Sequence, residues 1–233
     1  MNQVAYSQSA MYADESARAA FIRRTYLHLA GAVLAFVVLT GIILQTPIAP
    51  AMVGLMTGGY GWLVVMGLFL GVSFLADRWA RSETSPQMQY VGLGLFVVAE
   101  SIVFLPLLFI ASHYASGNVI PTAAAITGFL FLGLTAVVFF TRKDFSWIRS
   151  ILTIGGFIAM GFIVASIIFG FSLGLLFSVV MVAYAAGAIL YDTSNILHHY
   201  RTDQHVAASL ALFASVALLF WYVLRIVMGS SDD

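Results

Sequence analysis

The sequence predicts an all-α, polytopic membrane protein that crosses the bilayer with a bundle of seven helices. The first reason is composition: 61% of the residues are hydrophobic and only 9% are charged, whereas soluble domains carry about 25% charged residues. The second reason is that seven apolar segments are long enough to cross a membrane. The third is that the charged residues gather in short clusters between these segments. No linker divides the chain, so a single membrane domain is expected.

Each apolar segment provides the roughly 20 helical residues that are needed to cross a hydrocarbon core about 30 Å thick. A helix is expected in each, because a spanning helix satisfies all of its own backbone groups in lipid. Only Phe171 and Ser172 separate the fifth and sixth segments, but together these segments are too long for one crossing. The predicted spans are Tyr26–Leu44, Ala51–Ala76, Tyr90–Ala111, Val119–Phe140, Ile148–Gly170, Ser172–Leu197 and Val206–Val227.

Three regions are predicted from these spans. Residues 1–25 form a polar cytoplasmic segment, residues 26–227 the transmembrane domain and residues 228–233 a short C-terminal tail. The N-terminal segment lacks the basic start and early cleavage site of a signal peptide, so we expect it to be retained. Within it, Phe21–Arg24 is expected to begin a helix at the membrane interface.

Basic residues predict the orientation, because Lys and Arg are enriched in loops that face the cytoplasm. The segments Gln45–Pro50, Ser112–Asn118 and Phe171–Ser172 contain neither. Seven crossings therefore place the N-terminus in the cytoplasm and the C-terminus outside, with a bacterial inner membrane as the expected location. Arg225 is an exception that can extend to the interface. The basic residues of the inner loops are Arg18, Arg23, Arg24, Arg78, Arg81, Arg142, Lys143, Arg149 and Arg201.

Two acidic residues lie within predicted spans, where an ionisable group usually faces a polar pathway or a partner. Glu100 lies roughly 15 Å into the third span by helical rise, and burial there favours the neutral acid. Asp192 belongs to the polar sequence Tyr191–Asn195 near the inner end of the sixth span. This sequence indicates a water-filled inner vestibule.

A purely structural role remains open for both acids. Asp192 could pair with an arginine such as Arg78 or Arg81 and only stabilise the bundle. Glu100 could form a hydrogen bond, as a neutral acid, with a neighbouring helix.

Several functional classes are not expected. His198, His199 and His205 surround a short loop without an HExxH pattern, and the chain contains no cysteine, so no metal site is predicted. No enzymatic activity and no cofactor are expected. The net charge of zero gives no indication of a nucleic-acid partner. The only lysine, Lys143, lies in a loop, which excludes a retinal Schiff base in the last span.

Three motifs stand at the ends of predicted spans. Phe21–Tyr26 precedes the first span, Leu190–Ile196 ends the sixth, and a loop with Asp144, Phe145 and Ser146 follows the fourth. In their order and placement, these motifs resemble the Bax inhibitor family, also called the transmembrane Bax inhibitor motif or YccA-like family. The resemblance runs from about residue 20 to residue 227. It implies a seven-helix bundle with the seventh helix at its centre.

The resemblance also implies a function. Some members are pH-sensitive calcium leak channels, and eukaryotic members are associated with suppression of cell death. In the family's leak mechanism, aspartates on spans six and seven share a proton and hold the pore closed, and an arginine near the end of span two is a further partner. Asp192 matches the first aspartate, and Arg78 or Arg81 matches the arginine. Ser215 stands where the second aspartate is typical, so the pair of carboxyl groups is incomplete.

Glu100 is predicted at a depth similar to that of Ser215, which raises the hypothesis that it replaces the missing carboxyl group. Two carboxyl groups within a few ångströms would titrate as a coupled pair. Calcium prefers oxygen ligands, so an acidic pathway suits this ion. The primary functional hypothesis is a pH-sensitive calcium leak channel in the lipid bilayer. The alternative is a non-conducting regulatory protein that binds a partner such as a membrane-bound protease.

Overall fold

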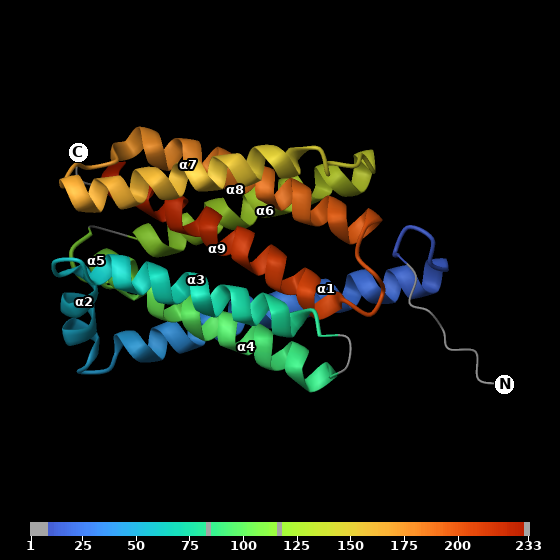
Figure 1. The fold of residues 1–233 in the computed structure, drawn as a ribbon, viewed down its shortest axis with the longest axis horizontal. Helices are drawn as coiled ribbons and strands as arrows, with labels where there is room; N and C mark the ends of the chain where they lie inside the picture. Colours follow the sequence, from blue (N-terminus) through green and yellow to red (C-terminus); the bar gives the residue numbers. More distant parts are fainter. Residues whose placement is uncertain (1–8, 83–84, 116–117, 231–233) are drawn as a thin grey trace.

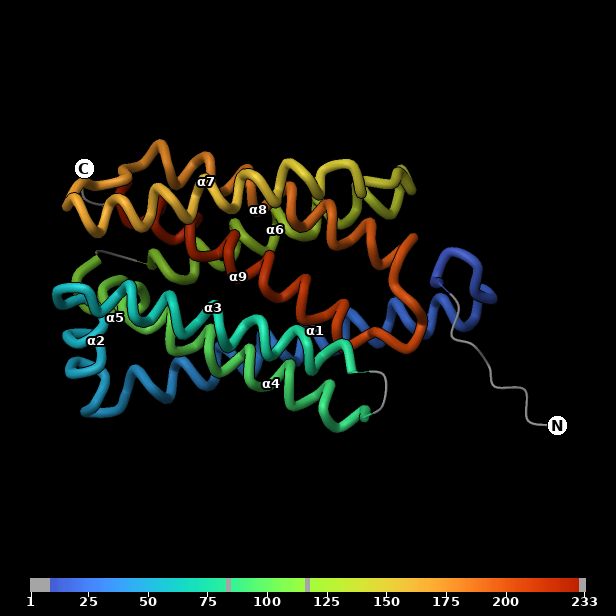
Figure 2. Tube along the Cα trace, viewed as in Figure 1, coloured from blue at the N-terminus to red at the C-terminus, as the bar shows by residue number. Residues whose placement is uncertain are grey.

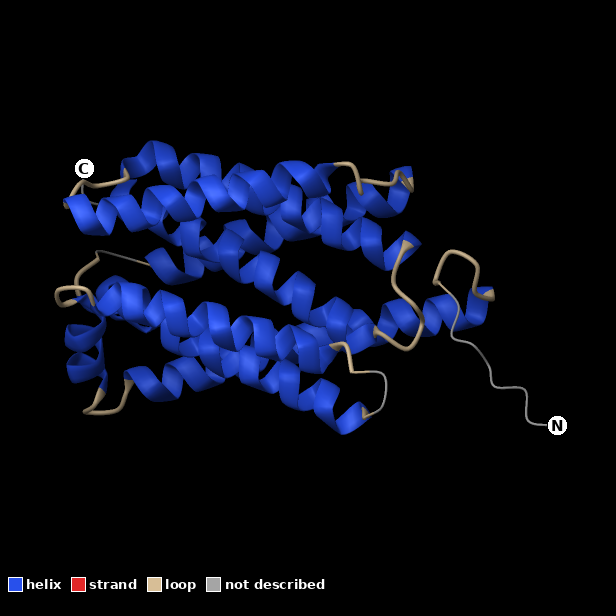
Figure 3. Cartoon of the chain, viewed as in Figure 1, coloured by secondary structure: helices blue, strands red, loops and turns tan. Residues whose placement is uncertain are grey.

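The computed structural model describes residues 9–82, 85–115 and 118–230, and in these ranges the chain forms helices joined by short loops (Figures 1 and 3). The ends of the predicted polar segment and tail, residues 1–8 and 231–233, lie outside the described residues, as do residues 116 and 117 of the predicted outer loop. The helices are α1 (Glu15–Leu44), α2 (Ala49–Thr57), α3 (Gly61–Ala80), α4 (Pro86–Val103), α5 (Leu105–His113), α6 (Val119–Thr141), α7 (Ile148–Phe169), α8 (Gly174–His198) and α9 (His205–Ser230).

The number of crossings agrees with the prediction from hydrophobicity. Among the described residues, six single helices are long and apolar enough to cross a membrane, and α4 with α5 makes up to seven if this bent pair is one span. Large apolar side chains cover the outer faces: Phe140 of α6 is 88% exposed and Phe157 of α7 is 77% exposed. Such surfaces are stable against lipid but not against water. The protein is therefore an all-α, polytopic membrane protein.

The second predicted span is interrupted. Its residues, Ala51–Ala76, divide between α2 and α3 at a tight turn in which Gly59 has a φ of +51°. Glycine adopts this left-handed conformation without the steric cost of a Cβ atom. The helix α2 lies at the end of the bundle opposite the basic loops, and α3 continues to Ala80 (Figure 1). The prediction of one continuous helix was therefore wrong, because an apolar run does not reveal a turn between apolar residues.

The third predicted span is bent rather than straight. Helices α4 and α5 meet at Phe104 with an angle of 45° between them. Pro106 explains the bend, since a proline has no N–H to donate to the carbonyl of Ile102 and its ring crowds the preceding turn. The bend places α5 against α2 at this same end of the bundle, opposite the basic loops.

The first helix begins earlier than predicted, at Glu15, so Phe21–Arg24 lies inside α1 rather than at its start. Before it, the chain folds over the loop between α8 and α9. The Ala10 N–H donates to the Tyr200 carbonyl at 2.8 Å, and the Ser9 hydroxyl donates to the His198 carbonyl at 2.7 Å. The described part of the polar segment is therefore ordered against the end of the bundle.

The last helix lies at the centre of the bundle, as the family resemblance implied. In Figures 1 and 2, α9 crosses between a group formed by α1, α3 and α4 and a group formed by α6, α7 and α8. It packs against α1, α3, α4, α6 and α8. Of the 18 residues in its most apolar stretch, half are buried inside the bundle, compared with 6% of the corresponding stretch of α7. Substitutions on α9 therefore affect both groups of helices.

Candidate functional site

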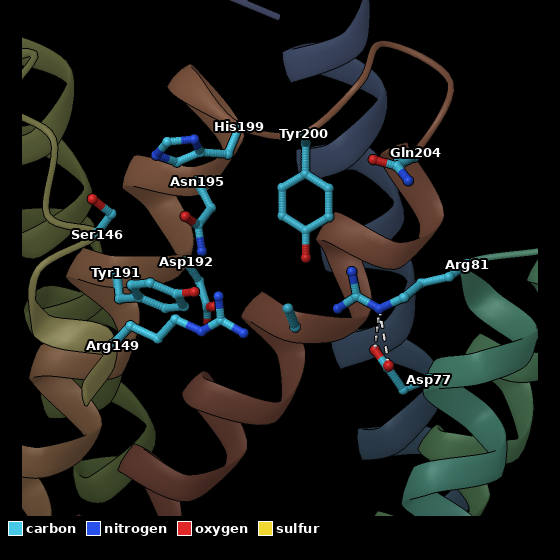
Figure 4. Close-up of a pocket in the computed structure, with 11 residues that line it drawn as sticks. Asp77, Arg81, Ser146, Arg149, Tyr191, Asp192, Asn195, His199, Tyr200 and Gln204 are labelled. Carbon is cyan, nitrogen blue, oxygen red and sulfur yellow. Dashed lines mark hydrogen bonds and ion pairs between the residues drawn. The ribbon is translucent and has the colours of Figure 1, made fainter. Parts of the chain in front are cut away.

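A polar cavity opens at the end of the bundle that carries the basic loops (Figure 4). Its volume is about 550 Å³, and it lies between α3, α7, α8 and α9. It contains Asp192, Arg81, and the motif residues Tyr191 and Ser146. The vestibule that the polar end of the sixth span predicted therefore has a counterpart in the structure. Its complete lining is Asp77, Arg81, Ser146, Arg149, Tyr191, Asp192, Asn195, His199, Tyr200, Gln204 and Ala211.

A hydrogen bond between Asp192 and Ser215 joins α8 to the central helix. The Ser215 hydroxyl donates to Asp192 Oδ2 at 2.6 Å. This distance is typical of an O–H group that donates to a carboxylate, which is among the stronger hydrogen bonds in proteins. Ser215 is 7% exposed, so water does not readily compete for the bond. The serine at the place of a second aspartate therefore still binds Asp192, but it contributes no second titrating group.

Arg81 extends from the end of α3 into the same cavity. Its Nε lies 2.9 Å from both carboxylate oxygens of Asp77, one helical turn earlier. Its charge also attracts Asp192. The sequence left Arg78 and Arg81 as alternatives for this position. Of these two arginines, Arg81 lines the cavity and Arg78 does not.

Tyr200 stands over Arg81 in the loop between α8 and α9. The guanidinium carbon is 5.8 Å from the centre of the tyrosine ring, a distance that allows a cation–π interaction, and Figure 4 shows the hydroxyl directed toward the arginine. Burial raises the pKa of the Tyr200 phenol to about 12, although the charge of Arg81 acts against this rise. The phenol is therefore neutral at physiological pH.

The loop after α6 docks directly onto the polar end of α8. The Phe145 N–H donates to the Ser194 hydroxyl oxygen at 2.9 Å. The Ser146 N–H donates to Asp144 Oδ1 at 2.8 Å and closes a turn within the loop. Two motifs that are about 50 residues apart in the sequence thus form one contact beside the cavity.

Asp144 carries the electrostatic part of this contact. Its Oδ2 lies 3.1 Å from Nε2 of His199, which lines the cavity. Desolvation acts to raise the pKa of the Asp144 carboxyl group, but the hydrogen bond from Ser146 and the attraction of His199 outweigh it, so the net pKa lies below the usual value. Both side chains remain about half exposed, and the pair is therefore open to solvent.

Glu100 lies in a second cavity and not beside Asp192. This cavity has a volume of about 660 Å³ and is lined mainly by apolar and aromatic side chains of α3, α4, α7 and α9. Glu100 is 7% exposed. Within the described residues, no hydrogen bond or ion pair joins it to Asp192, and neither acid lines the other's cavity. The proposed pairing of these two acids therefore has no counterpart in this conformation.

The two cavities approach each other along the central helix. Ala211 of α9 lines the first cavity, and Ala214, three residues later, lines the second. Residues three apart in a helix lie on the same face. The second cavity continues along this face past Leu218 to Arg225. Along α9 these two lining residues are thus about one helical turn apart, and Ser215, which donates to Asp192, directly follows Ala214.

The histidines form no metal-binding cluster with acids in the described part of the chain. No group of three or more His, Asp or Glu side chains there is close enough to hold a metal ion. His198 instead contacts its own helix through the Ser194 carbonyl at 2.9 Å. His205 packs its ring against His28 of α1, with 4.9 Å between the ring centres.

Sequence reasoning missed Tyr200 and Gln204 as cavity residues. Both lie in a short loop, and only their closeness in sequence to His199 could have indicated them. The spacing of four residues between Asp77 and Arg81 is typical of a charge pair on one helix face, and the structure contains that pair. What spacing could not show is that this pair faces Asp192 across a cavity.

Similarity to known proteins extends over nearly the whole chain. The sequence profile described as "Inhibitor of apoptosis-promoting Bax1" matches residues 18–233. An uncharacterized protein of Pseudomonas aeruginosa is 31% identical over 167 residues, which cover 71% of each chain. The Escherichia coli protein named Modulator of FtsH protease YccA is 29% identical over 172 residues, 73% of this chain and 76% of YccA. Bax inhibitor 1 of Schizosaccharomyces pombe is 27% identical over 221 residues, 91% of this chain and 77% of that protein.

The matched residues include the central helix α9, the polar cavity and the contact between the loop after α6 and the end of α8. The resemblance that the three sequence motifs indicated is thereby confirmed. With its apolar helices and its match over residues 18–233, this chain belongs to the Bax inhibitor family of integral membrane proteins.

Proposed function

We propose that this protein forms a pH-sensitive leak pathway for cations, and that Ca²⁺ is an ion that it passes. The observation that carries the proposal is the Asp192–Ser215 hydrogen bond of 2.6 Å, because Asp192 lines the first cavity and Ser215 directly follows Ala214, which lines the second. The first cavity opens at the basic end of the bundle, and the second reaches Arg225 near the opposite end of α9. In this proposal, the Asp192–Ser215 bond keeps the pathway closed between the two cavities.

Protonation of Asp192 provides the pH dependence in this proposal. The ionised carboxylate accepts a hydrogen bond from Ser215 and is attracted by Arg81, so it links α8, α9 and α3. The protonated acid loses the charge attraction, and the link weakens. Flux is therefore expected to rise as the pH falls. The other titratable or charged groups that line the first cavity are Asp77, Arg81, Arg149, Tyr191, His199 and Tyr200, and Tyr184 also interacts electrostatically with Asp192.

Calcium suits this pathway for a chemical reason. Ca²⁺ binds oxygen ligands in flexible geometry; the first cavity contains the carboxyl groups of Asp77 and Asp192, and the second contains that of Glu100. Each cavity exceeds the roughly 30 Å³ that one water occupies in the liquid, so the ion can keep much of its hydration shell. The proposal includes no catalytic step.

The test is proton-dependent calcium flux into liposomes that contain the purified protein. Wild type is expected to conduct more at pH 6 than at pH 8. Asp192→Asn should remove this difference, because the amide cannot change charge, whereas Glu100→Gln should retain it. No flux through wild type, or a wild-type pH profile in Asp192→Asn, would contradict the proposal.

A second candidate is a non-conducting regulator of a membrane-bound protease. It is supported by the relative from Escherichia coli, whose name describes a modulator of the FtsH protease. The same liposomes with purified protein separate the two candidates, since a non-conducting regulator produces no calcium flux.

A related protein from another Escherichia coli strain is named an inner membrane protein, which supports the bacterial inner membrane as the location of this chain.

A further inference from the structure

The cavity around Glu100 contains polar groups that nothing in the described structure satisfies. The Glu100 carboxyl group is more than nine-tenths buried, and no side chain of the described residues donates to it. The Ser73 hydroxyl lines the same cavity and has no hydrogen-bond partner. Buried polar groups without partners each cost about 1–3 kcal/mol. Two of them in one cavity therefore indicate that a ligand can supply the missing partner.

Aromatic rings form much of the remaining wall. Trp62 of α3 stacks on Trp221 of α9 with 5.9 Å between ring centres, and Phe104 meets the edge of Trp221 at 4.9 Å. Phe69 and Phe96 form a further pair at 5.9 Å. The faces of aromatic rings carry negative charge density and attract cations, most strongly when water is excluded. An acid surrounded by such rings is suited to a positively charged group with an apolar body.

The size of the cavity favours an organic ligand. A volume of about 660 Å³ lies within the range of about 300–1,000 Å³ that is typical of small-molecule sites. A bound Ca²⁺ or Mg²⁺ ion would need six or more oxygen ligands, and no group of three metal-binding side chains exists among the described residues. The cavity reaches the loop between α7 and α8 through Phe171 and Leu173, so a ligand can enter from the end opposite the basic loops.

Arg225 lines the same cavity, but it lies too far from Glu100 to repel strongly a cation that is bound there. Glu100 lies one turn before Phe104 on α4, and Arg225 lies one turn after Trp221 on α9, while the rings of Phe104 and Trp221 are in contact. The two charged residues are therefore about two turns, or roughly 11 Å, apart along the bundle. Arg225 stands near the mouth of the cavity and Glu100 near its middle.

We propose that the cavity between α3, α4, α7 and α9 binds a hydrophobic ammonium compound, with its ammonium group on the Glu100 carboxylate and its apolar body on Phe104 and Trp221. Ser73 accepts a second N–H hydrogen bond from the ammonium group. This binding goes beyond the proposed leak pathway and does not depend on it, because a closed or non-conducting protein can still bind the ligand.

The test uses three probes of equal length: 4-phenylbutylammonium, the neutral 4-phenylbutanol and the anionic 4-phenylbutanoate. Binding to the purified protein in nanodiscs is followed by the fluorescence of Trp62 and Trp221, which line the cavity. We expect the ammonium probe to bind at least tenfold more tightly than the alcohol. Glu100→Gln should remove this preference, and Ser73→Ala should weaken ammonium binding by about three- to tenfold, as expected for one hydrogen bond.

Two controls keep the result interpretable. Retained binding of 4-phenylbutanol by Glu100→Gln shows that the cavity is intact, and Arg225→Gln should leave ammonium binding unchanged. Equal ammonium affinity in wild type and Glu100→Gln would overturn the proposal, as would the absence of ammonium binding to wild type. Tighter binding of 4-phenylbutanoate, lost in Arg225→Gln, would overturn it in favour of an anion site. Calcium flux is not measured, so the outcome is separate from that of the leak hypothesis.

Discussion

Ser215 of the central helix donates its hydroxyl to Asp192 of α8 at 2.6 Å, at the level where the two cavities approach each other. The chain itself connects α8 and α9 only through the short loop between His198 and His205, and this loop does not hold the rest of the two helices together. The bond therefore matters as a side-chain link between adjacent helices. A serine can form this link with an ionised aspartate, whereas a second carboxylate would need a shared proton.

Ser215→Ala should destabilise the folded state and increase calcium leak. The substitution leaves a buried carboxylate oxygen without its donor, which costs about 1.5–3 kcal/mol. Thermal unfolding in detergent and liposome flux measure the two effects. Ser209→Ala is the matched control, because Ser209 is also buried in α9 but donates to the Val206 carbonyl of its own helix at 2.8 Å. An equal rise in leak for both variants would show that the Asp192–Ser215 bond has no special role.

Arg81→Gln should change the pH dependence of flux, and Arg78→Gln should not. Arg81 lines the cavity and attracts Asp192, whereas Arg78 does not line the cavity. Loss of the exposed Arg81–Asp77 pair should itself cost no more than about 1 kcal/mol of stability. Flux between pH 6 and pH 8 is the measurement. The assignment of Arg81 fails if both variants keep the wild-type profile or if only Arg78→Gln alters it.

Asp144→Asn should lower stability in a pH-dependent way. The folded-state pKa of Asp144 is lower than usual, so its ionised form stabilises the fold above the ordinary aspartate pKa of about 3.9. This contribution is lost as the pH falls through the lower folded-state pKa. For a half-exposed pair we expect a difference below about 1 kcal/mol at pH 7. Unfolding curves measured from pH 7 to pH 3 should converge for wild type and Asp144→Asn.

His199→Gln is the comparison for this prediction. It removes the ring beside Asp144 but keeps the hydrogen bond from the Ser146 N–H. The variant should therefore show a smaller loss at pH 7 than Asp144→Asn. Curves for Asp144→Asn that stay apart by the same amount at every pH would indicate a steric effect of the amide instead.

Gly92→Ala should separate α3 from α4. A Cβ atom at Gly92 would lie 2.6 Å from the Ala76 carbonyl oxygen and 2.7 Å from the Ala80 nitrogen, and neither backbone atom can move without its helix. We expect a loss of about 1–3 kcal/mol, as for other overpacked sites. Gly94→Ala, two residues along the same helix, meets nothing within 4 Å and should be neutral or stabilising by up to about 1 kcal/mol. Thermal unfolding of both variants should therefore show opposite or clearly unequal shifts.

The predicted orientation can be tested with single cysteines, because the chain contains none of its own. Ser230 lies at the end of α9 and Thr141 at the end of α6, at opposite ends of the bundle (Figure 2), and both are exposed. We expect a membrane-impermeant maleimide to label Ser230→Cys in intact cells and Thr141→Cys only after lysis. The reverse pattern would place the basic loops outside.

Hydrophobicity alone located most of the membrane helices. Helices α6 and α7 begin at the predicted residues Val119 and Ile148, and α8 and α9 begin and end within a few residues of their predictions. Such predictions succeed because each residue contributes separately to the free-energy cost of placing a polar backbone or a charged side chain in lipid. This cost can therefore be estimated for each segment of the sequence without knowing its neighbours in the fold.

The tertiary structure decided which polar residues meet. Glu100 and Ser215 have similar depths along their helices, yet Ser215 contacts Asp192 and Glu100 lies in another cavity. Depth follows from helical rise, whereas contact depends on how each helix is rotated and where it crosses its neighbours. These angles result from packing over the whole bundle. The sequence by itself therefore determined the membrane architecture and the family, and only the packing around α9 decided the partners of Asp192, the choice of Arg81 and the separate surroundings of Glu100.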